Sequence, residues 1–270
     1  MMNLKLKAAE LRHDIIQSLA AAKSGHPGGS LSTIDILTVL YYQEMEITPE
    51  NFAEKDRDHF ILSKGHAAPA LYAVLADKGF FQKEELLKLR KFGSLLQGHP
   101  DRIKTPGVDS SSGSLGQGLS IANGLALAKR LDGSQKGVYV LLGDGELQEG
   151  QIWEAAMTAA HYQLDHLIAF VDNNGLQIDG TNQEVMAVEN IGEKFAAFNW
   201  FVLKADGHDV DSLTQAIQQA KAYKQGPSVI ICNTIKGKGV SFMENQVGWH
   251  GKAPSTDEAQ RALAELKEAY

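Results

Sequence analysis

The sequence predicts an α/β protein, in which a parallel sheet is flanked by helices on both faces and residues 1–270 form a single domain. Short apolar runs alternate with longer segments whose apolar residues recur at helical spacing. The clearest runs, 138–142 and 167–171, each end in polar and glycine residues, which is typical of buried parallel strands. The helical segment between them completes a βαβ unit with a right-handed crossover.

The remaining elements follow from periodicity and from breaker residues. Segment 24–29 contains glycine and proline and interrupts the helical pattern, and Ser32 with Asp35 resembles a capping box that opens the next helix. Segment 93–118 is rich in serine and glycine and runs into a helix, so we expect a loop of backbone donors there. Helices are expected at 3–22, 33–42, 67–77, 83–91, 119–130, 147–161, 189–198, 210–223 and 256–270, and strands at 58–63, 138–142, 167–171, 200–205 and 228–234.

The composition is that of an ordinary globular protein, with 43% hydrophobic residues, 22% charged residues and a net charge of −7. This charge and the small number of basic clusters argue against a nucleic-acid partner. No apolar stretch has the length of a membrane span and the N-terminus lacks a signal-peptide core, so we expect a cytoplasmic protein without membrane contact. The single cysteine, Cys232, lies in an apolar run and should be buried and unreactive.

Polar residues follow the two clearest strands. Asp144 and Asn174 are placed at the carboxyl ends of neighbouring strands, where ligands bind to open α/β sheets. A carboxylate and a carboxamide suit a hard cation such as Mg²⁺ that also binds phosphate oxygens. Gly143 and Gly145 would let the backbone approach the ligand. The alternative is that Asp144 and Asn174 only cap turns.

Four of the nine histidines follow a glycine directly, where chance predicts about one. We expect four histidines beside glycine turns to line a cleft, where imidazoles can contact phosphate or hydroxyl oxygens or relay protons; these are His26, His66, His99 and His250. The alternative is a set of loop histidines without function. His208 precedes a helix, and a capping or packing role is expected there, while structural roles are expected for His13, His59, His161 and His166.

Several common motifs are absent from the sequence. The glycines near Asp144 do not form the dinucleotide fingerprint, because Gln148 stands where the third glycine would fall. The sequence has no phosphate loop of the Gly-x-x-x-x-Gly-Lys-Ser/Thr type and no Gly-x-Ser-x-Gly nucleophile elbow. No histidine has the partners of a zinc site. A phosphate bridged by a metal ion is the interpretation that remains.

Short motifs resemble those of the transketolase family. Gly143-Asp144-Gly145 with Asn173-Asn174 is similar to the thiamine diphosphate motif. The surrounding similarities are Ser24-Gly-His-Pro-Gly28, Leu62-Ser-Lys-Gly-His66, Gly98-His-Pro100, Gly113-Ser-Leu-Gly-Gln-Gly118 and Asp144-Gly-Glu-Leu-Gln-Glu-Gly150. They occur in the family's order from about Arg12 to Pro254. The resemblance implies a thiamine diphosphate-binding fold of the diphosphate-binding type. One departure is Ser114, where many members have proline.

The resemblance also implies roles for individual residues. Asp144, Asn174 and the Leu176 carbonyl would bind Mg²⁺, for which Ca²⁺ or Mn²⁺ would substitute. His66 and Gly145 would contact the diphosphate, and the backbones of Gly113 and Leu115 would contact the aminopyrimidine. His26, His99 and His250 would act near the thiazolium ring on the donor sugar, with His250 also contacting the cofactor. Glu149 would be catalytic and Glu154 would contribute to the cofactor site, although Glu154 could equally be a solvated helix carboxylate.

The chain is much shorter than a complete transketolase, so the resemblance implies the N-terminal subunit of a two-subunit enzyme. A separate C-terminal subunit would supply the activating glutamate, in an α2β2 assembly that transfers a two-carbon unit between sugar phosphates. Such an enzyme would belong to the pentose phosphate pathway. One alternative is the cofactor-binding half of a deoxyxylulose-phosphate synthase or of a 2-oxo-acid decarboxylase. Another is a non-catalytic, regulatory module that binds the cofactor.

Overall fold

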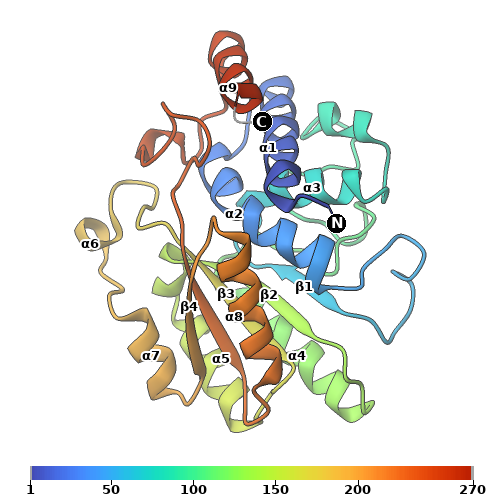
Figure 1. The fold of residues 1–270 in the computed structure, drawn as a ribbon, viewed down its shortest axis with the longest axis vertical. Helices are drawn as coiled ribbons and strands as arrows, with labels where there is room; N and C mark the ends of the chain where they lie inside the picture. Colours follow the sequence, from blue (N-terminus) through green and yellow to red (C-terminus); the bar gives the residue numbers. More distant parts are fainter. Residues whose placement is uncertain (1, 269–270) are drawn as a thin grey trace.

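The computed structural model describes residues 2–268, so part of the predicted last helix, at 269–270, lies outside the described residues. Five parallel strands form one sheet in the order β1-β2-β3-β5-β4 (Figure 1). The strands are β1 His59–Leu62, β2 Val138–Gly143, β3 Leu167–Asn173, β4 Phe201–Asp206 and β5 Ser228–Asn233. Each predicted strand is therefore confirmed, and the prediction of an α/β fold with a parallel sheet is correct.

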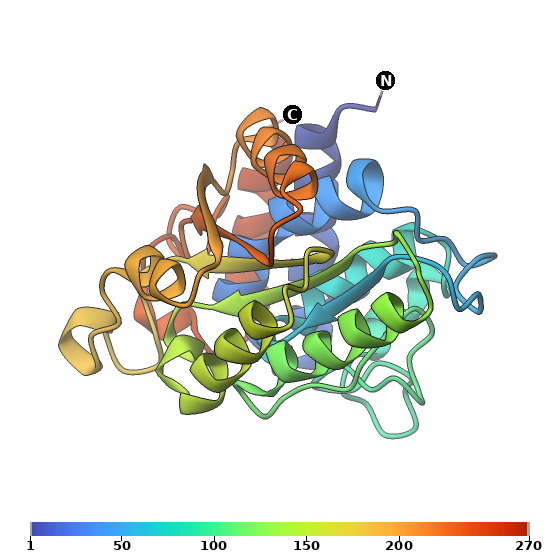
Figure 2. The same ribbon diagram turned by 90° about the horizontal axis from the view of Figure 1, so that it is seen from below.

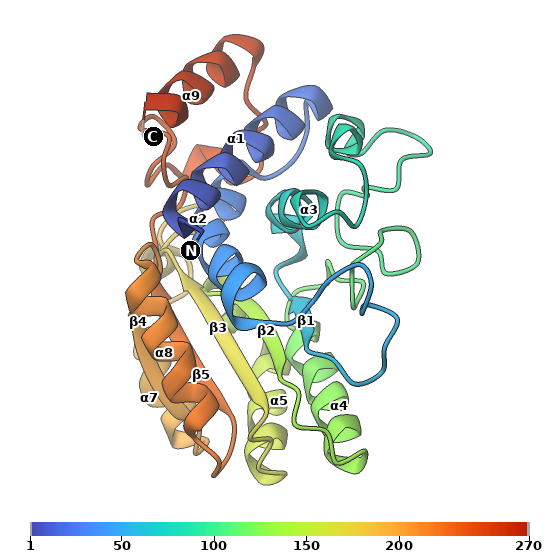
Figure 3. The same cartoon turned by 45° about the vertical axis from the view of Figure 1, so that its right-hand side comes forward.

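Helices cover both faces of the sheet. The α-helices are α1 Leu4–Ala22, α2 Pro27–Val39, α3 Ala68–Asp77, α4 Gln117–Leu131, α5 Gly150–His161, α6 Asn182–Val185, α7 Ile191–Ala197, α8 Val210–Ala222 and α9 Thr256–Glu268. One face packs against α4, α5 and α7, and the other against α2 and α8 (Figure 2). Helices α1, α3 and α9 form an outer layer beyond α2 (Figure 3).

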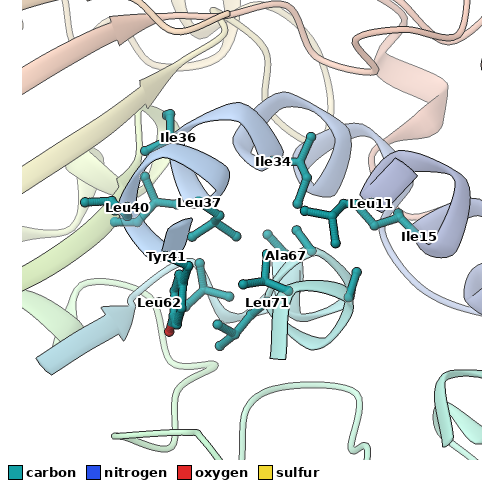
Figure 4. Close-up of a cluster of buried hydrophobic side chains, with 14 of the residues drawn as sticks. Leu11, Ile15, Ile34, Ile36, Leu37, Leu40, Tyr41, Leu62, Ala67 and Leu71 are labelled. Carbon is teal, nitrogen blue, oxygen red and sulfur yellow. The ribbon is translucent and has the colours of Figure 1, made fainter. Parts of the chain in front are cut away.

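The sheet separates two apolar cores because alternate side chains of each strand point to opposite faces. In β2, Val140 belongs to the core beneath α4 and α5, whereas Leu141 belongs to the core beneath α2. The second core continues outward between the helices, where Leu11 of α1, Ile34 of α2 and Leu71 of α3 meet (Figure 4). Burial on both faces explains why the strands are continuous apolar runs in the sequence.

The predicted start of the second helix is wrong. Helix α2 begins at Pro27 rather than at residue 33, because proline fits the first helical turn, where its missing N–H costs nothing. Gly28 is needed for packing rather than for a turn, since a Cβ there would lie 2.9 Å from the Lys236 Cγ. The proposed capping box is also wrong, because Ser32 and Asp35 lie inside the helix and bond to Asp172 and to Arg12.

Other helix predictions differ in detail. Residues predicted as a helix at 83–91 form only the 3₁₀ turn η3 Lys83–Lys88, and α2 continues into the π-helical turn η1 Leu40–Glu44. The segment after β2 forms the 3₁₀ turn η4 Gly145–Gln148 before α5 begins. The sequence analysis missed α6, a single turn closed by a capping box between Thr181 and Glu184. Cys232 is fully buried, as predicted.

Helix α4 begins in close contact with the end of β1. A Cβ on Gly118 would lie 2.4 Å from the Cβ of Ser63, which is closer than two carbon atoms can approach. Gly124 of the same helix is exposed, and a Cβ there would meet no atom within 4 Å. Glycine is therefore required for packing at position 118 and only weakens the helix at position 124.

The Asp172 carboxylate joins four segments at the carboxyl edge of the sheet. It is fully buried, forms an ion pair with Lys64 and accepts a hydrogen bond from Thr234. Ser32 of α2 donates to it at 2.7 Å, and Asn174 Nδ2 at 3.0 Å. Burial opposes ionisation, but the ammonium and the hydrogen bonds outweigh it and hold the pKa of Asp172 below its usual value.

Gly118→Ala should lower the free energy of unfolding by about 1–3 kcal/mol, because the new methyl group overlaps the β1 turn. Gly124→Ala is the matched control and should raise the free energy of unfolding by up to about 1 kcal/mol, because alanine favours the helix. Urea denaturation measures both values. Equal effects of the two substitutions would contradict the close contact at Gly118.

Lys64→Met should lower the free energy of unfolding by about 3–5 kcal/mol, because it leaves the Asp172 carboxylate buried without its countercharge. Lys252→Met is the control, since Lys252 pairs with Glu258 at the surface and such pairs contribute little. Urea denaturation of both variants without ligands tests the difference. A Lys64→Met variant as stable as the parent would show that the ion pair does not maintain this edge of the sheet.

Candidate functional site

A cavity of about 220 Å³ opens at the carboxyl ends of β2 and β3. Its position confirms that Asp144 and Asn174 follow neighbouring parallel strands. Eight residues predicted from the sequence line the cavity: His66, Leu115, Asp144, Gly145, Glu149, Asn174, Leu176 and His250. The sheet therefore gathers at one edge residues that are far apart in the chain.

Asp144 is the only predicted carboxylate that is buried in this cavity, with 2% of its surface exposed. Its two oxygens accept the backbone N–H groups of Gly145 at 2.8 Å and of Gly175 at 2.5 Å. Within residues 2–268, no lysine, arginine or histidine forms an ion pair with it. Burial, followed by repulsion from Asp172, raises the pKa of Asp144 to about 6. The site therefore contains a buried carboxylate that forms no ion pair with the described residues.

The loop after β3 presents oxygen atoms close to Asp144. Asn174 Oδ1 accepts the Leu176 N–H at 3.1 Å, which fixes the start of the loop. The Leu176 carbonyl accepts a hydrogen bond from Lys236 Nζ at 3.0 Å, so a positive charge lies at this oxygen. Burial, followed by repulsion from Lys64, lowers the pKa of Lys236 to about 8. A carboxylate, an amide and a carbonyl are together a donor set for a hard divalent cation.

The four histidines expected in a cleft lie together. The ring centre of His26 lies 5.3 Å from that of His66, 6.3 Å from His99 and 5.6 Å from His250. The rings of His66 and His250 are 5.2 Å apart. His66 and His250 line the cavity, whereas His26 and His99 lie outside its lining. The expectation that all four line one cleft is therefore met by His66 and His250 only, and the roles of the four histidines stay predictions.

All four imidazoles are neutral at pH 7. Burial, followed by the charge of Arg90, lowers the pKa of His26 to about 4 and also lowers that of His99. Burial, followed by the charge of Lys236, lowers the pKa of His250 to about 3. Burial and the nearby Lys64 keep the pKa of His66 well below its usual value. Neutral imidazoles can hydrogen-bond to ligand oxygens as donors or acceptors.

The histidine at position 208 has the structural role expected for it. Its Nδ1 lies 2.6 Å from the Asp35 carboxylate, and its Nε2 accepts the Ile235 N–H at 2.8 Å. His208 thus connects Asp35 of α2 to the segment that carries Lys236. Asp35 also pairs with Arg12 of α1. The cap of α8 is supplied instead by the neighbouring Asp209, which accepts the Ser212 N–H.

Three further predicted residues lie at the margin of the cavity or outside it. Gly113 has a left-handed backbone, and a Cβ there would lie 3.3 Å from the His99 ring, so it borders the histidine cluster. Glu149 lines the cavity but is exposed at the start of α5. Glu154 is exposed one turn further along α5, away from the cavity lining. The structure therefore does not bring Glu154 to the cavity, and its assignment stays a prediction.

The backbone donors predicted at the start of α4 have a partner within the chain. Buried Glu146 accepts the Gly116 N–H at 2.9 Å and the Gly143 N–H at 3.0 Å, and it also accepts the Ser63 hydroxyl at 2.5 Å. The negative charge at this helix N-terminus is thus the protein's own carboxylate. The prediction that this loop offers backbone donors to a ligand is wrong at Gly116, because the Gly116 N–H already donates to Glu146.

Sequence reasoning missed four charged residues of the site: Lys64, Glu146, Asp172 and Lys236. The first three stand within or directly beside the motifs that resemble the transketolase family. Their roles depend on partners elsewhere in the chain, such as the pairing of Lys64 with Asp172 across 108 positions. A lysine inside an otherwise apolar or glycine-rich segment was the available signal.

A larger depression, of about 510 Å³, lies next to the cavity beneath segment 181–192. Among its lining residues in the described chain, none is a predicted site residue. Residues 2–268 contain no cluster of three or more histidine, cysteine, aspartate or glutamate side chains arranged for a metal. Within the same residues, no helix is long and apolar enough to cross a membrane. The smaller cavity is therefore the candidate site.

Comparison with known proteins assigns the chain to a family. A family model described as transketolase, thiamine diphosphate binding domain, matches residues 5–269. The 6-deoxy-6-sulfo-D-fructose transketolase subunit SqwG of a Clostridium species is 45% identical, with 98% of this chain and 97% of the relative covered. One of the apulose-4-phosphate transketolase subunits of Phocaeicola vulgatus is 40% identical, with 98% and 94% covered.

Solved structures agree with the sequence match. A transketolase from Pichia stipitis superimposes with a TM-score of 0.92 at 30% identity, and the match covers 98% of this chain and 41% of that protein. The Campylobacter jejuni transketolase gives a TM-score of 0.91 at 33% identity, covering 98% and 43%. The chain thus spans less than half the length of these transketolases, but nearly the whole length of the two subunits. It belongs to the transketolase family and is a thiamine diphosphate-binding transketolase subunit of the N-terminal type.

Proposed function

We propose that the cavity binds thiamine diphosphate together with Mg²⁺, and that the chain transfers a two-carbon ketol unit jointly with a separate C-terminal subunit. The observation that carries the proposal is the buried Asp144 carboxylate, which forms no ion pair within residues 2–268 and lines the cavity together with Asn174 and Leu176. A divalent cation at these three oxygens would supply the missing charge. Ca²⁺ or Mn²⁺ should substitute, because both accept oxygen ligands.

The charges around the cavity support a bound diphosphate. Lys236 contributes a cation, while the charge of Lys64 is already neutralised by Asp172. One ammonium is too little for a diphosphate in a cavity that also contains Asp144, so a metal ion is required. We assign the diphosphate contacts to His66 and the Gly145 N–H, and the aminopyrimidine contacts to the backbones of Gly113 and Leu115.

Thiamine diphosphate supplies the carbanion chemistry of ketol transfer when it is bound. This chain's contribution is to hold the metal and the diphosphate, and to present neutral imidazoles to the sugar. We assign His26, His99 and His250 to the hydroxyl groups of the donor sugar phosphate, because the rings of His26 and His99 lie close to His250, which lines the cavity. Glu149 at the cavity mouth is the carboxylate assigned to catalysis, and Glu154 is assigned to the cofactor-site interface.

The proposed partner completes the site. Within the cavity lining of this chain, the exposed Ile178 is an apolar side chain with 65% of its surface open to solvent. Glu149 of the lining is also exposed, and so is His99 of the histidine cluster. Apolar and catalytic residues exposed together are typical of a surface that a second chain covers. The two relatives are each named as a transketolase subunit, which supports an assembly of two kinds of chain, for which we propose α2β2.

The alternative functions would require different residues in and around the cavity. A regulatory module without catalysis would not require the histidine cluster, whereas His26, His66, His99 and His250 are all held together here. The cofactor-binding half of a deoxyxylulose-phosphate synthase or a 2-oxo-acid decarboxylase is less consistent with the histidines at Gly25-His26 and Gly98-His99. Location in the cytoplasm and a place in the pentose phosphate pathway remain predictions.

Reconstitution tests the two-subunit proposal. The purified chain should show no ketol transfer alone, and activity should appear when the C-terminal subunit encoded beside it is added with thiamine diphosphate and Mg²⁺. The assay should include pentose phosphates, apulose 4-phosphate and 6-deoxy-6-sulfo-D-fructose. The last two sugars appear in the names of the two related transketolase subunits. Native mass spectrometry gives the stoichiometry. Full activity of the isolated chain would refute the proposal.

Asp144→Ala should abolish the part of thiamine diphosphate affinity that depends on Mg²⁺, because it removes the buried anionic ligand. Calorimetry with and without Mg²⁺, on the reconstituted enzyme and on the chain alone, measures this part. Asp179→Ala is the control, since Asp179 is an exposed carboxylate of the neighbouring turn outside the cavity lining. If the Asp144 variant retained its Mg²⁺-dependent affinity, the ligand assignment would be wrong.

A further inference from the structure

Arg90 lies behind the histidine cluster in an unusual backbone conformation. It follows η3 and has a φ of 60°, in the left-handed region that non-glycine residues rarely adopt. Its backbone N–H donates to the Leu96 carbonyl at 2.9 Å, which closes the turn. The side chain is half-buried and does not line the cavity. Its position therefore suggests that it acts on the residues around it.

The guanidinium joins the two turns that carry His26 and His99. Nη1 donates to the Ser24 hydroxyl at 3.1 Å, and Nη2 donates to the Gly98 carbonyl at 3.2 Å. A Cβ on Gly98 would lie 3.0 Å from the guanidinium carbon. Glycine before His99 thus makes room for Arg90, which gives a physical reason for one of the glycine–histidine pairs in the sequence.

The same nitrogen, Nη2, also lies 3.5 Å from Nδ1 of His26. Arginine remains charged at any physiological pH and can only donate hydrogen bonds. Nδ1 of His26 must therefore be the acceptor, which places the ring proton on Nε2. The opposite edge of the ring, with Cδ2 and Nε2, faces Gly251, where each atom lies 3.7 Å from the position a Cβ would take. This edge faces the turn of His250 at the histidine cluster.

We propose that Arg90 is a positioning residue that holds the His26 and His99 turns together and fixes His26 as the Nε2–H tautomer. The proposal rests on the proposed function only in its last step, which is that His26 faces the donor sugar as a hydrogen-bond donor and not as a base. The tautomer itself follows from the contacts of Arg90. Arg90 is distinct from the residues assigned to the metal, the cofactor and the sugar.

The charges that surround His26 agree with this assignment. Burial contributes most to the lowering of its pKa from 6.5 to about 4, followed by Arg90, His99 and Lys236. Because protonation would place a second cation against the guanidinium, the ring stays neutral. The charged and titratable groups facing His26 from the packed segments are Arg90, His66, His99, Lys236 and His250.

Nitrogen NMR of the full chain labelled with ¹⁵N-histidine tests the proposal directly. Comparison with His26→Gln assigns the His26 signals, and the long-range ¹H–¹⁵N pattern distinguishes the tautomers. The parent should show the Nε2–H form at pH 7 and remain neutral down to about pH 5. Arg90→Met should raise the pKa of His26 by about one unit and produce both tautomers, because the charge and the donor are lost.

Arg90→Lys preserves the charge and should keep the pKa of His26 low. If Arg90 had only a structural role, the Arg90→Lys and Arg90→Met variants would not differ in the pKa of His26. Arg102→Met is the matched control, because Arg102 is an exposed arginine of the same connecting segment. An Nδ1–H or charged His26 in the parent would overturn the proposal, and this measurement needs no Arg90 variant to fold. An unchanged pKa and tautomer in Arg90→Met would also overturn it.

A kinetic measurement on the reconstituted enzyme tests the last step. Arg90→Met should lower kcat for ketol transfer by about 10- to 100-fold, as expected for a displaced hydrogen-bond donor, while the Kd for thiamine diphosphate stays the same. Equal losses of kcat and of cofactor affinity would contradict a role limited to His26. If the parent enzyme showed no ketol transfer, the proposed function would fail, but the NMR result would stand.

Discussion

The Asp172 carboxylate is the constraint on which the carboxyl edge of the sheet depends. It is fully buried, and the groups that bond to it come from α2, from the turn after β1, from the exit of β5 and from the loop after β3. A buried carboxylate is tolerated only when its hydrogen bonds and its countercharge are supplied. Because Lys64 supplies that charge and Asn174 one of the hydrogen bonds, the structural network also fixes a residue of the candidate metal site.

This arrangement leaves Asp144 without an ion-pair partner among residues 2–268. Lys64 reaches the cavity lining, but its charge is neutralised by Asp172, and Lys236 bonds to the Leu176 carbonyl rather than to Asp144. The second carboxylate at the sheet edge is therefore both buried and repelled by the first, which raises its pKa. The buried Asp172–Lys64 pair that stabilises the fold thus leaves the negative charge of Asp144 uncompensated, and a divalent cation would neutralise it.

The sheet and the centre of the site were predictable because their signals are local. Strands buried on both faces are continuous apolar runs, and the residues just after them, such as Asp144 and Asn174, must meet at one edge. The start of α2 was missed because proline and glycine usually interrupt helices, whereas Pro27 occupies the first turn and Gly28 packs against Lys236. The roles of Lys64 and Lys236 were missed because both depend on residues far away in the chain.

The positive charges of the site also explain why its histidines are neutral. Arg90 lies against His26, and Lys236 lies 2.9 Å from Nδ1 of His250, so each ring has a cation on its Nδ1 side. A cation behind an imidazole disfavours protonation and leaves Nε2 free to act toward a ligand. These two rings are therefore neutral hydrogen-bonding groups at neutral pH and poor bases. Under the proposed function, strong proton acceptors would come from the cofactor or from the proposed partner subunit.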